Sequence, residues 1–154
     1  MALDKTDKDL LYYLQQDSKM STKLMAIKLG LSVTAVYERI KKLEKSGFIK
    51  KYVAVLNKEK IDRNFVVFCQ IKLIQHSHDY IMKFESDVKK FEEVLECYNV
   101  SGSYDYILKV IVKNMKAYRN FINNKLTTLN YIGSTHSTFI LTEVKQQNIV
   151  SLTP

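Results

Sequence analysis

Apolar residues recur at helical spacing in the first part of the chain. Leu10, Leu11 and Leu14 share one side of a predicted helix. Asp4 and Asp7 lie near its start, where the positive end of the helix dipole stabilises carboxylates. The pattern therefore predicts an amphipathic helix whose apolar side packs against other elements.

Two further helices follow, joined by a short turn. Ser21 is a suitable N-cap for a helix that runs to Leu29. Residues 30–32 (Gly-Leu-Ser) have the length of the turn that joins the two helices of a helix-turn-helix. The next helix has Ser32 as its N-cap and Gly47 as its stop, because glycine readily adopts the left-handed conformation that ends helices. Three such helices can enclose a small core and leave the last one free to enter a DNA groove.

The third helix has two chemically different faces. Val36, Ile40 and Leu43 fall at i, i+4 and i+7 and form an apolar face. Hydroxyl and charged side chains that could reach base edges and phosphates occupy the opposite side: Thr34, Glu38, Lys41, Lys42 and Lys45. An ordinary amphipathic surface helix would fit this segment equally well on its own. The preceding helix and turn favour DNA binding.

Beyond residue 60 the pattern changes to runs rich in β-branched and aromatic residues. Strands are predicted over 65–74, 94–100, 104–112 and from 133 to about 144, with helices over 80–91 and 115–126. The order strand–helix–strand–strand–helix–strand is that of a ferredoxin-like βαββαβ domain. Because both helices cover one face of such a sheet, the other face predicts a homodimer.

The fold class is therefore α+β, with two domains. Residues 1–60 are predicted to form a (winged) helix-turn-helix DNA-binding domain, in which the helix-turn-helix spans about 22–41 and a strand linker spans 50–57. Residues 61–154 are predicted to form a ferredoxin-like βαββαβ domain.

Charge supports a polyanionic partner for the first domain. The chain carries 24 Lys and Arg residues against 16 Asp and Glu, a net charge of +8. Residues 1–60 hold 13 basic and 7 acidic residues, whereas residues 61–154 hold 11 and 9. Lysines that only maintain solubility would explain a modest excess of positive charge, but they explain its uneven distribution less well. The first domain is therefore expected to bind nucleic acid.

Other classes of site have weaker support. His76 and His78 could bind a metal, but the absence of a matching Cys or acidic cluster favours solvated histidines, and no metal is expected. No phosphate-binding glycine loop or nucleophile motif is present. No apolar run approaches the roughly 20 residues that cross a bilayer, so no membrane association is expected. Cys69 and Cys97 are expected to be buried thiols, and the protein to be cytoplasmic.

Three segments resemble the Lrp/AsnC (feast/famine) family of transcriptional regulators. They are residues 31–49 (Leu-Ser-Val-Thr-Ala-Val-Tyr-Glu-Arg-Ile-Lys-Lys-Leu-Glu-Lys-Ser-Gly-Phe-Ile), 100–106 (Val-Ser-Gly-Ser-Tyr-Asp-Tyr) and 143–146 (Glu-Val-Lys-Gln). The likeness covers nearly the whole chain and is nearer to the leucine-responsive branch. It implies a regulator that forms dimers through the C-terminal sheet, often closes four dimers into an octamer, and binds an effector, commonly an amino acid, between dimers. It implies no other cofactor.

The resemblance also assigns residues to two sites. The recognition helix becomes Val33–Lys45, and its DNA-binding residues are Ser32, Thr34, Ala35, Tyr37, Glu38, Arg39, Lys41, Lys42 and Lys45. Arg39 lies at the edge of the apolar face and suits a phosphate contact or an internal ion pair equally. The effector-binding residues become Asn99, Ser101, Gly102, Ser103, Tyr104, Asp105, Met115, Thr138, Phe139 and Ile140. Backbone amides of the hairpin could hold a carboxylate and Asp105 an ammonium group, while Ser103 replaces an acid common in the family.

The predicted function is that of a sequence-specific regulator that binds double-stranded DNA under the control of a small effector. Two alternatives are a tetrapyrrole-modifying enzyme of related architecture and a DNA-wrapping protein without an effector. The enzyme would be expected to lose the basic helix face and to gain convergent His or Arg residues in the C-terminal domain. Lys41, Lys42 and Lys45 are instead retained, which favours the regulator.

Overall fold

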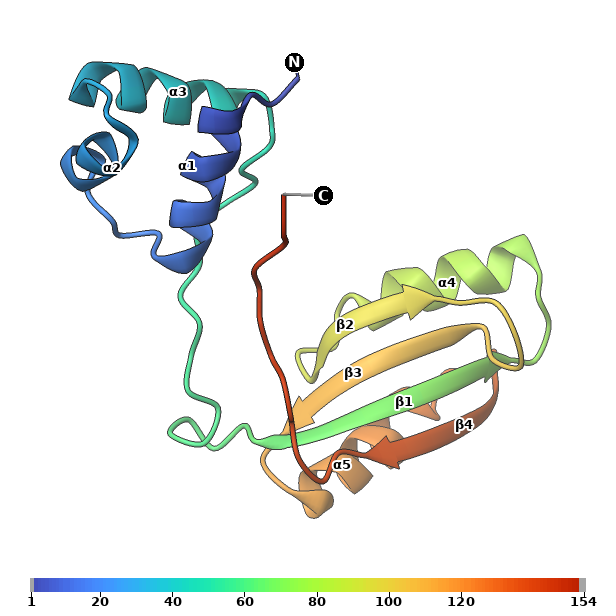
Figure 1. The fold of residues 1–154 in the computed structure, drawn as a ribbon. Coiled ribbons are helices and arrows are strands. Elements are labelled where there is room, and N and C mark those ends of the chain that lie inside the picture. The colour runs from blue at the N-terminus through green and yellow to red at the C-terminus, as the bar shows by residue number, and fades with distance from the viewer. Residues whose placement is uncertain (1, 153–154) are drawn as a thin grey trace. The chain divides into compact units, whose positions relative to one another are not determined.

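The computed structural model describes residues 2–152, which divide into two compact units (Figure 1). The helical unit comprises the chain up to Val55 together with the segment from Lys145 onward, and the sheet unit comprises Leu56–Val144. This division differs from the one expected at the C-terminus. The sequence places residues 145–152 in the sheet domain, whereas in the structure they belong to the helical unit.

Three helices build the helical unit around one small core. They are α1 (Lys5–Gln16), α2 (Thr22–Leu29) and α3 (Val33–Lys45). Six buried side chains fill the space between them: Leu10, Leu11, Met25, Ala26, Val36 and Leu43. Leucines spaced along α1 therefore meet the apolar face of α3, as the periodicity predicted.

Both ends of α3 are determined by local sequence. Ser32 Oγ accepts a hydrogen bond from the Ala35 amide at 3.1 Å, which satisfies one of the unpaired donors of the first turn. Gly47 has a φ of 75°. The Gly47 amide bonds to Glu44 O at 3.0 Å, and the Phe48 amide bonds to Leu43 O at 3.0 Å. This is a Schellman ending, and the span Val33–Lys45 predicted for the recognition helix is confirmed.

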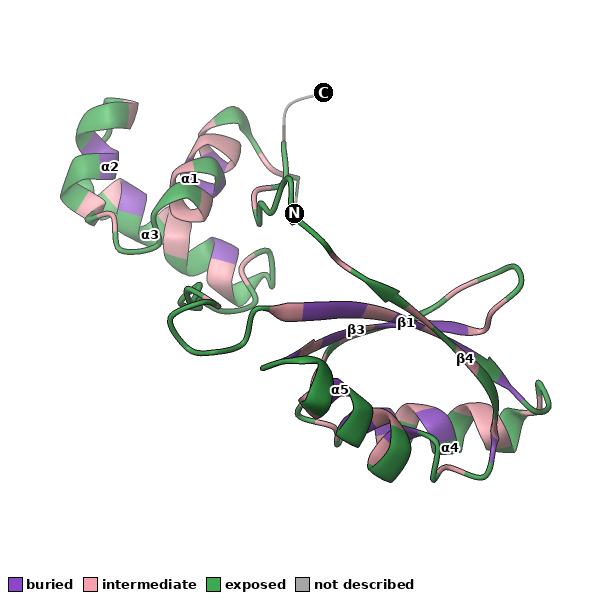
Figure 2. Ribbon diagram, turned by 90° about the horizontal axis from the view of Figure 1, so that it is seen from below, coloured by how far each residue is buried: buried purple, intermediate pink, exposed green. Residues whose placement is uncertain are grey.

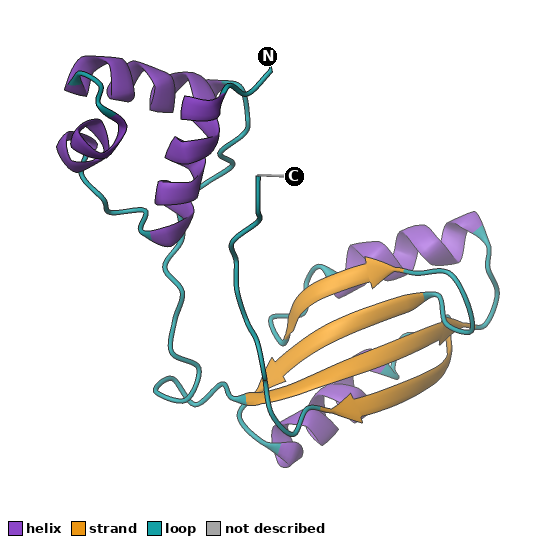
Figure 3. Ribbon diagram, viewed as in Figure 1, coloured by secondary structure: helices purple, strands orange, loops and turns teal. Residues whose placement is uncertain are grey.

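The strand predicted over residues 50–57 does not form (Figure 3). A strand forms only when it is hydrogen-bonded to a neighbouring strand. The described part of the helical unit contains no second strand with which this segment could pair. The β-branched sequence still keeps this segment out of a helix. Its apolar side chains Val53 and Val55 are exposed.

The C-terminal segment is fixed to α1 by a two-way hydrogen bond. Gln15 Nε2 donates to Val150 O at 3.2 Å, and the Val150 amide donates to Gln15 Oε1 at 2.8 Å. Leu152 adds a partly buried side chain to the helical core. The Gln15 side-chain amide thus pairs both backbone groups of Val150, as a neighbouring strand would.

The Gln15→Ala variant is expected to release this segment while leaving the helices intact. Each lost hydrogen bond contributes about 0.5–1.5 kcal/mol, so exchange of the Val150 amide with solvent should accelerate by about tenfold. Hydrogen-exchange mass spectrometry measures this directly. Gln16→Ala, at an exposed neighbouring position, is the matched control and should leave Val150 protection unchanged.

The sheet unit contains four antiparallel strands in the order β2-β3-β1-β4. The strands are β1 (Phe65–Leu73), β2 (Val94–Asn99), β3 (Tyr106–Val112) and β4 (Ile132–Phe139). With α4 (His78–Val88) and α5 (Met115–Phe121) between strands, the chain has the predicted βαββαβ order. The α+β fold class is confirmed.

Both helices of the sheet unit lie on one face of the sheet, as Figure 2 shows. Alternate residues of the central strands point into the layer between sheet and helices, including Cys69, Ile71 and Leu108, all fully buried. Phe84 of α4 and Phe121 of α5 fill that layer from the helix side. This packing leaves the opposite face of the sheet without a covering layer within the sheet unit.

Two elements and one cysteine of the sheet unit depart from the sequence-based expectations. The helix predicted over 115–126 ends as an α-helix at Phe121 and continues as a π-helical turn, Ile122–Leu126, in which the Thr127 amide bonds to Ile122 O. Strand β4 ends at Phe139 rather than near residue 144. The Ile140 amide still bonds to Val66 O at 3.1 Å, but β1 begins at Phe65, so the following residues have no strand to pair with. Cys97, expected to be buried, is exposed because it lies on the edge strand β2.

Candidate functional site

The outer side of α3 presents a continuous row of polar and basic side chains. Seven of the nine predicted DNA-binding residues are exposed: Ser32, Thr34, Tyr37, Glu38, Lys41, Lys42 and Lys45. The other two, Ala35 and Arg39, are half-buried. The buried positions Val36 and Leu43 hold the opposite side of α3 against the core, so this row faces away from the core of the helical unit.

Lys42 and Lys45 are the free cations of this surface. The side chain of neither makes a hydrogen bond or an ion pair with any described residue. Lys41 differs, because its Nζ lies 3.1 Å from Glu44 Oε2 and 5.7 Å from the centroid of the Tyr37 ring. The hydrogen bond with Glu44 raises the pKa of Lys41. Lys42 and Lys45 are therefore the side chains best suited to take phosphates without first giving up a partner.

Arg39 makes an internal ion pair, which resolves the two roles that the sequence left open for it. Its Nη1 lies 2.7 Å from Asp4 Oδ2 and 2.7 Å from Asp7 Oδ1. The Asp7 side chain is only 6% exposed. Hydrogen bonds to both carboxylates raise the pKa of Arg39. The guanidinium thus ties α3 to the start of α1, and its expected place among the DNA contacts is not supported by this geometry.

The acidic pair of α1 also has a role that sequence reasoning missed. The Asp7 amide donates to Asp4 Oδ1 at 2.7 Å, and the Asp4 amide donates to Asp7 Oδ2 at 3.3 Å. The two side chains form a capping box and together receive Arg39. The Asp-x-x-Asp spacing before an apolar run signals the capping box, but not the arginine 32 residues further on.

The predicted effector hairpin joins β2 to β3 and is held mainly by Asp105. Asp105 Oδ2 accepts from the Leu73 amide at 2.8 Å, and Asp105 Oδ1 lies 3.2 Å from His76 Nδ1. Its carbonyl accepts from the Val100 amide at 2.9 Å and from Asn99 Nδ2 at 3.1 Å. Gly102 at the tip has a φ of 118°, which favours glycine. Asp105 therefore shapes the hairpin, in keeping with the turn-residue role that its sequence position also allows.

The predicted effector residues do not come together within one chain. Those of the hairpin (Asn99, Ser101, Gly102, Ser103, Tyr104 and Asp105) lie at the end of the sheet where β3 begins. Met115, Thr138, Phe139 and Ile140 follow the other end: Met115 comes just after β3 ends at Val112, and Phe139 pairs with Val67. The length of β3 separates the two groups by about 20 Å.

Phe139 also has a packing role that competes with the one expected for it. Its ring lies 5.5 Å from that of Tyr118 and 5.9 Å from that of Phe65, measured between centroids. Phe139 is nevertheless 40% exposed, and Met115 is 39% exposed. One edge of each side chain thus remains available at this end of the sheet.

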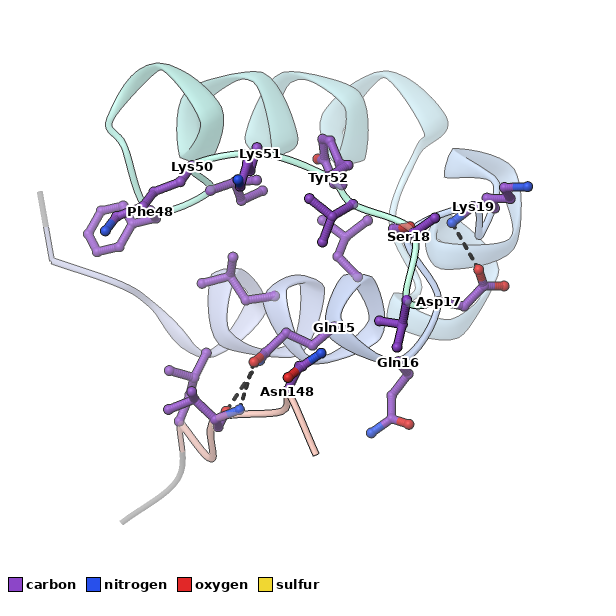
Figure 4. Close-up of a pocket in the computed structure, with 18 of the residues that line it drawn as sticks. Gln15, Gln16, Asp17, Ser18, Lys19, Phe48, Lys50, Lys51, Tyr52 and Asn148 are labelled. Atoms are coloured by element: carbon purple, nitrogen blue, oxygen red, sulfur yellow. Dashed lines mark hydrogen bonds between the residues drawn. The ribbon is translucent and has the colours of Figure 1, made fainter. Parts of the chain in front are cut away.

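Two concave regions exist elsewhere on the described chain. A groove of about 650 Å³ in the helical unit lies between the end of α1, the segment from Phe48 to Val55, and Asn148, Val150 and Leu152 (Figure 4). A smaller pocket of about 400 Å³ in the sheet unit is lined by Tyr80, Lys83, Thr128, Leu129, Asn130 and Tyr131. Neither includes a predicted effector residue.

Two other kinds of site find no support within residues 2–152. No group of three or more His, Cys, Asp or Glu side chains is arranged to hold a metal ion. No helix in that range is both long and apolar enough to cross a membrane.

Both units match known protein families. Residues 3–50 match a winged helix-turn-helix DNA-binding family, and residues 66–150 match the Lrp/AsnC ligand binding domain. The chain is 39% identical over 146 residues to the leucine-responsive regulatory protein of Klebsiella pneumoniae, covering 95% of this chain and 89% of that protein. The Escherichia coli K12 protein of the same name is 38% identical over the same length, with the same coverage.

Solved structures agree with these relatives. A transcriptional regulator from Neisseria meningitidis, in complex with L-Met, superposes with a TM-score of 0.92 at 28% identity, covering 99% of this chain and 97% of that one. An AsnC family regulator from Agrobacterium tumefaciens gives a TM-score of 0.91 at 33% identity, with 96% of each chain covered. These proteins regulate transcription and are not enzymes, so the tetrapyrrole-modifying alternative is set aside. The chain belongs to the Lrp/AsnC family of DNA-binding transcriptional regulators, and its sheet unit matches the ligand binding domain of that family.

Proposed function

We propose that this protein binds double-stranded DNA by placing the outer side of α3 in the major groove. The observation that carries the proposal is the exposed row on α3, in which Lys42 and Lys45 have no partner among the described residues. Thr34 and Tyr37 face the same side and bring a hydroxyl and an aromatic ring to base edges. A protein of this kind acts where the DNA is, which we take to be the cytoplasm.

The second part of the proposal is a homodimer formed through the uncovered face of the sheet. Phe68, Ile107 and Ile111 alternate with the core positions of β1 and β3, so they belong to that face. Lys109 on the same face is neutralised by Glu96, with 3.1 Å between Nζ and Oε1. An apolar centre whose charge is already paired suits contact with a second copy. A dimer also presents two α3 helices to neighbouring half-sites.

The third part concerns the effector, which we propose to be an amino acid bound between subunits. The hairpin around Gly102 and the Met115–Phe139 group lie at opposite ends of one sheet. Subunits arranged head to tail would bring the hairpin of one against the second group of the next. We take the closed form of this arrangement to be an octamer of four dimers, which would link effector binding to assembly. The Neisseria meningitidis regulator, with its bound L-Met, supports an amino acid as the class of ligand.

The test of the effector site is a pair of substitutions at Asp105, assayed by calorimetry against the twenty amino acids. Asp105→Asn keeps an oxygen that can accept from the Leu73 amide but removes the charge offered to an ammonium group. We expect amino-acid affinity to fall by at least tenfold in Asp105→Asn, because a charge-assisted hydrogen bond is lost. Thermal stability should change little.

Asp105→Ala serves as the comparison, because it also removes the acceptor of the Leu73 amide and should lower stability. Unchanged amino-acid affinity in Asp105→Asn would move the effector site elsewhere. Binding of none of the twenty amino acids by the unmodified protein, with DNA binding intact, would favour a DNA-wrapping protein without an effector.

A further inference from the structure

Glu38 is an unpaired carboxylate in the middle of the DNA-facing side of α3. It is exposed and makes no hydrogen bond or ion pair with any residue that the structure describes. Thr34 precedes it by four residues, and Lys41 and Lys45 follow it by three and seven, so all four share one face of the helix. The side chain therefore projects from the centre of the surface proposed to enter the groove.

The lack of an ion pair at Glu38 is informative because suitable cations are near. Lys42 lies four residues further on, the spacing and order in which Glu and Lys pair best on a helix, yet no such pair forms. Lys41 pairs instead with Glu44. The carboxylate is thus free to accept hydrogen bonds from a ligand without first breaking a bond within the protein.

A free carboxylate on a DNA-binding surface needs a compensating contact. Phosphates repel it, so an exposed Glu in a groove lowers the affinity of the protein for DNA in general. A hydrogen-bond donor on a base edge compensates this cost and does so only at particular bases. In the major groove the bases that offer a donor are cytosine, through its N4 amino group, and adenine, through its N6 amino group.

Cytosine fits the carboxylate better than adenine does. Adenine carries the N7 acceptor beside its amino group, and that lone pair opposes the carboxylate. Guanine and thymine present the acceptors O6, N7 and O4 and repel it more strongly. The N4 amino group of cytosine is the only major-groove hydrogen-bonding group of that base, so a carboxylate can approach it without facing a second acceptor on the same base.

We propose that Glu38 is a specificity-determining residue that selects a C·G pair in each half-site by accepting a hydrogen bond from cytosine N4. This inference rests on the proposed binding of DNA through α3 and adds a division of roles to it. Lys42 and Lys45 raise the affinity for any DNA by contacting phosphates. Glu38 lowers that general affinity but distinguishes a C·G pair from the other base pairs.

The experiment is selection of duplex DNA from a randomised pool by the full-length protein, followed by sequencing. Three proteins are compared with the unmodified one: Glu38→Ala, Glu38→Gln and Asp9→Asn. Asp9 lies on α1 and has no hydrogen bond or ion pair with the described residues, so Asp9→Asn repeats the change in net charge away from α3. Affinities are then measured for the selected site, for the site with its C·G pair replaced, and for unrelated duplex DNA.

The unmodified protein and Asp9→Asn should select a C·G pair at one position of each half-site. Both should prefer it over the replaced pair by about 5- to 150-fold, the range for one good base contact. In Glu38→Ala that preference should vanish. In Glu38→Gln it should weaken and adenine should be accepted as well, because the amide oxygen still accepts from cytosine N4 and the amide pairs with adenine N6 and N7. In both variants affinity for unrelated DNA should rise a few-fold because the repulsive charge is gone. Circular dichroism checks that both variants fold.

Retention of the same C·G preference in Glu38→Ala would overturn the inference, as would an equal rise in affinity for all three DNAs. Selection of sites without any C·G position would also overturn it and leave DNA binding by α3 standing. Failure of the unmodified protein to enrich any DNA would instead contradict the proposed function.

Discussion

Arg39→Ala is expected to destabilise the helical unit by about 1–3 kcal/mol and to weaken DNA binding only as far as the unfolded fraction rises. The substitution leaves the Asp7 carboxylate, 6% exposed, without the cation that offsets its burial. The loss of stability is smaller than for breaking a fully buried ion pair, because the Arg39 side chain is 36% exposed and water screens part of the interaction. Urea denaturation followed by circular dichroism at 222 nm measures the loss.

Lys42→Ala is the matched control for this prediction. It removes one positive charge from the same helix without breaking any hydrogen bond or ion pair that the structure describes, so stability should change by less than about 0.5 kcal/mol. Equal stability of Arg39→Ala and Lys42→Ala would show that the Asp4–Asp7–Arg39 network contributes little.

The Asp4–Asp7–Arg39 network should also make the stability of the helical unit depend on pH. The pKa of Asp4 lies below its ordinary value of 3.8, chiefly through the hydrogen bond from the Asp7 amide and then through Arg39. A depressed carboxyl pKa contributes stability above the ordinary value, and that stability is lost as the pH falls through the lower folded-state value. Unfolding from pH 6 to pH 2 should therefore show a loss of stability below about pH 4 that is smaller in Asp4→Asn.

Ile107→Asp is expected to convert the proposed dimer into monomers, raising its dissociation constant by at least 100-fold. Ile107 lies on central strand β3, on the face opposite the core positions Tyr106 and Leu108. A carboxylate placed there would be buried against the second copy without a partner, which costs several kcal/mol. Light scattering over micromolar concentrations reports the change, and DNA affinity should fall with it.

Two controls separate this effect from misfolding. Ile107→Val retains a β-branched apolar side chain and should remain dimeric. Met82→Asp introduces the same charge on α4, where the side chain is 54% exposed, and should also remain dimeric. A folded Ile107→Asp protein that still dimerises would place the interface on another surface.

Much of the fold follows from local sequence signals. Ser32 and Gly47 bound α3 because cap chemistry depends on residues next to the helix end. The alternation of β-branched and aromatic residues in β1 and β3 reflects burial on one face of the sheet, so the βαββαβ order is also predictable. These features need no knowledge of distant contacts.

Features that depend on long-range pairing were not predictable. The segment over 50–57 has strand composition, but a strand forms only where a neighbour exists. The partner of Arg39 lies 32 residues away in Asp7, and that of Val150 lies 135 residues away in Gln15. Asp105 could not be identified as a hairpin anchor from its sequence, because its acceptor role depends on the Leu73 amide of another strand.

The binding of DNA through α3 is tested most directly by the salt dependence of affinity for duplex DNA. We expect log K to fall linearly with log salt concentration, with a slope of about −0.9 for each phosphate neutralised. The double variant Lys42→Ala/Lys45→Ala should reduce the magnitude of the slope by about 2 for each α3 that contacts DNA. Lys89→Ala/Lys116→Ala, with the same change in net charge on exposed positions of the sheet unit, should leave the slope unchanged. A slope that the Lys42 and Lys45 substitutions do not alter would contradict the placement of the DNA-binding surface on α3.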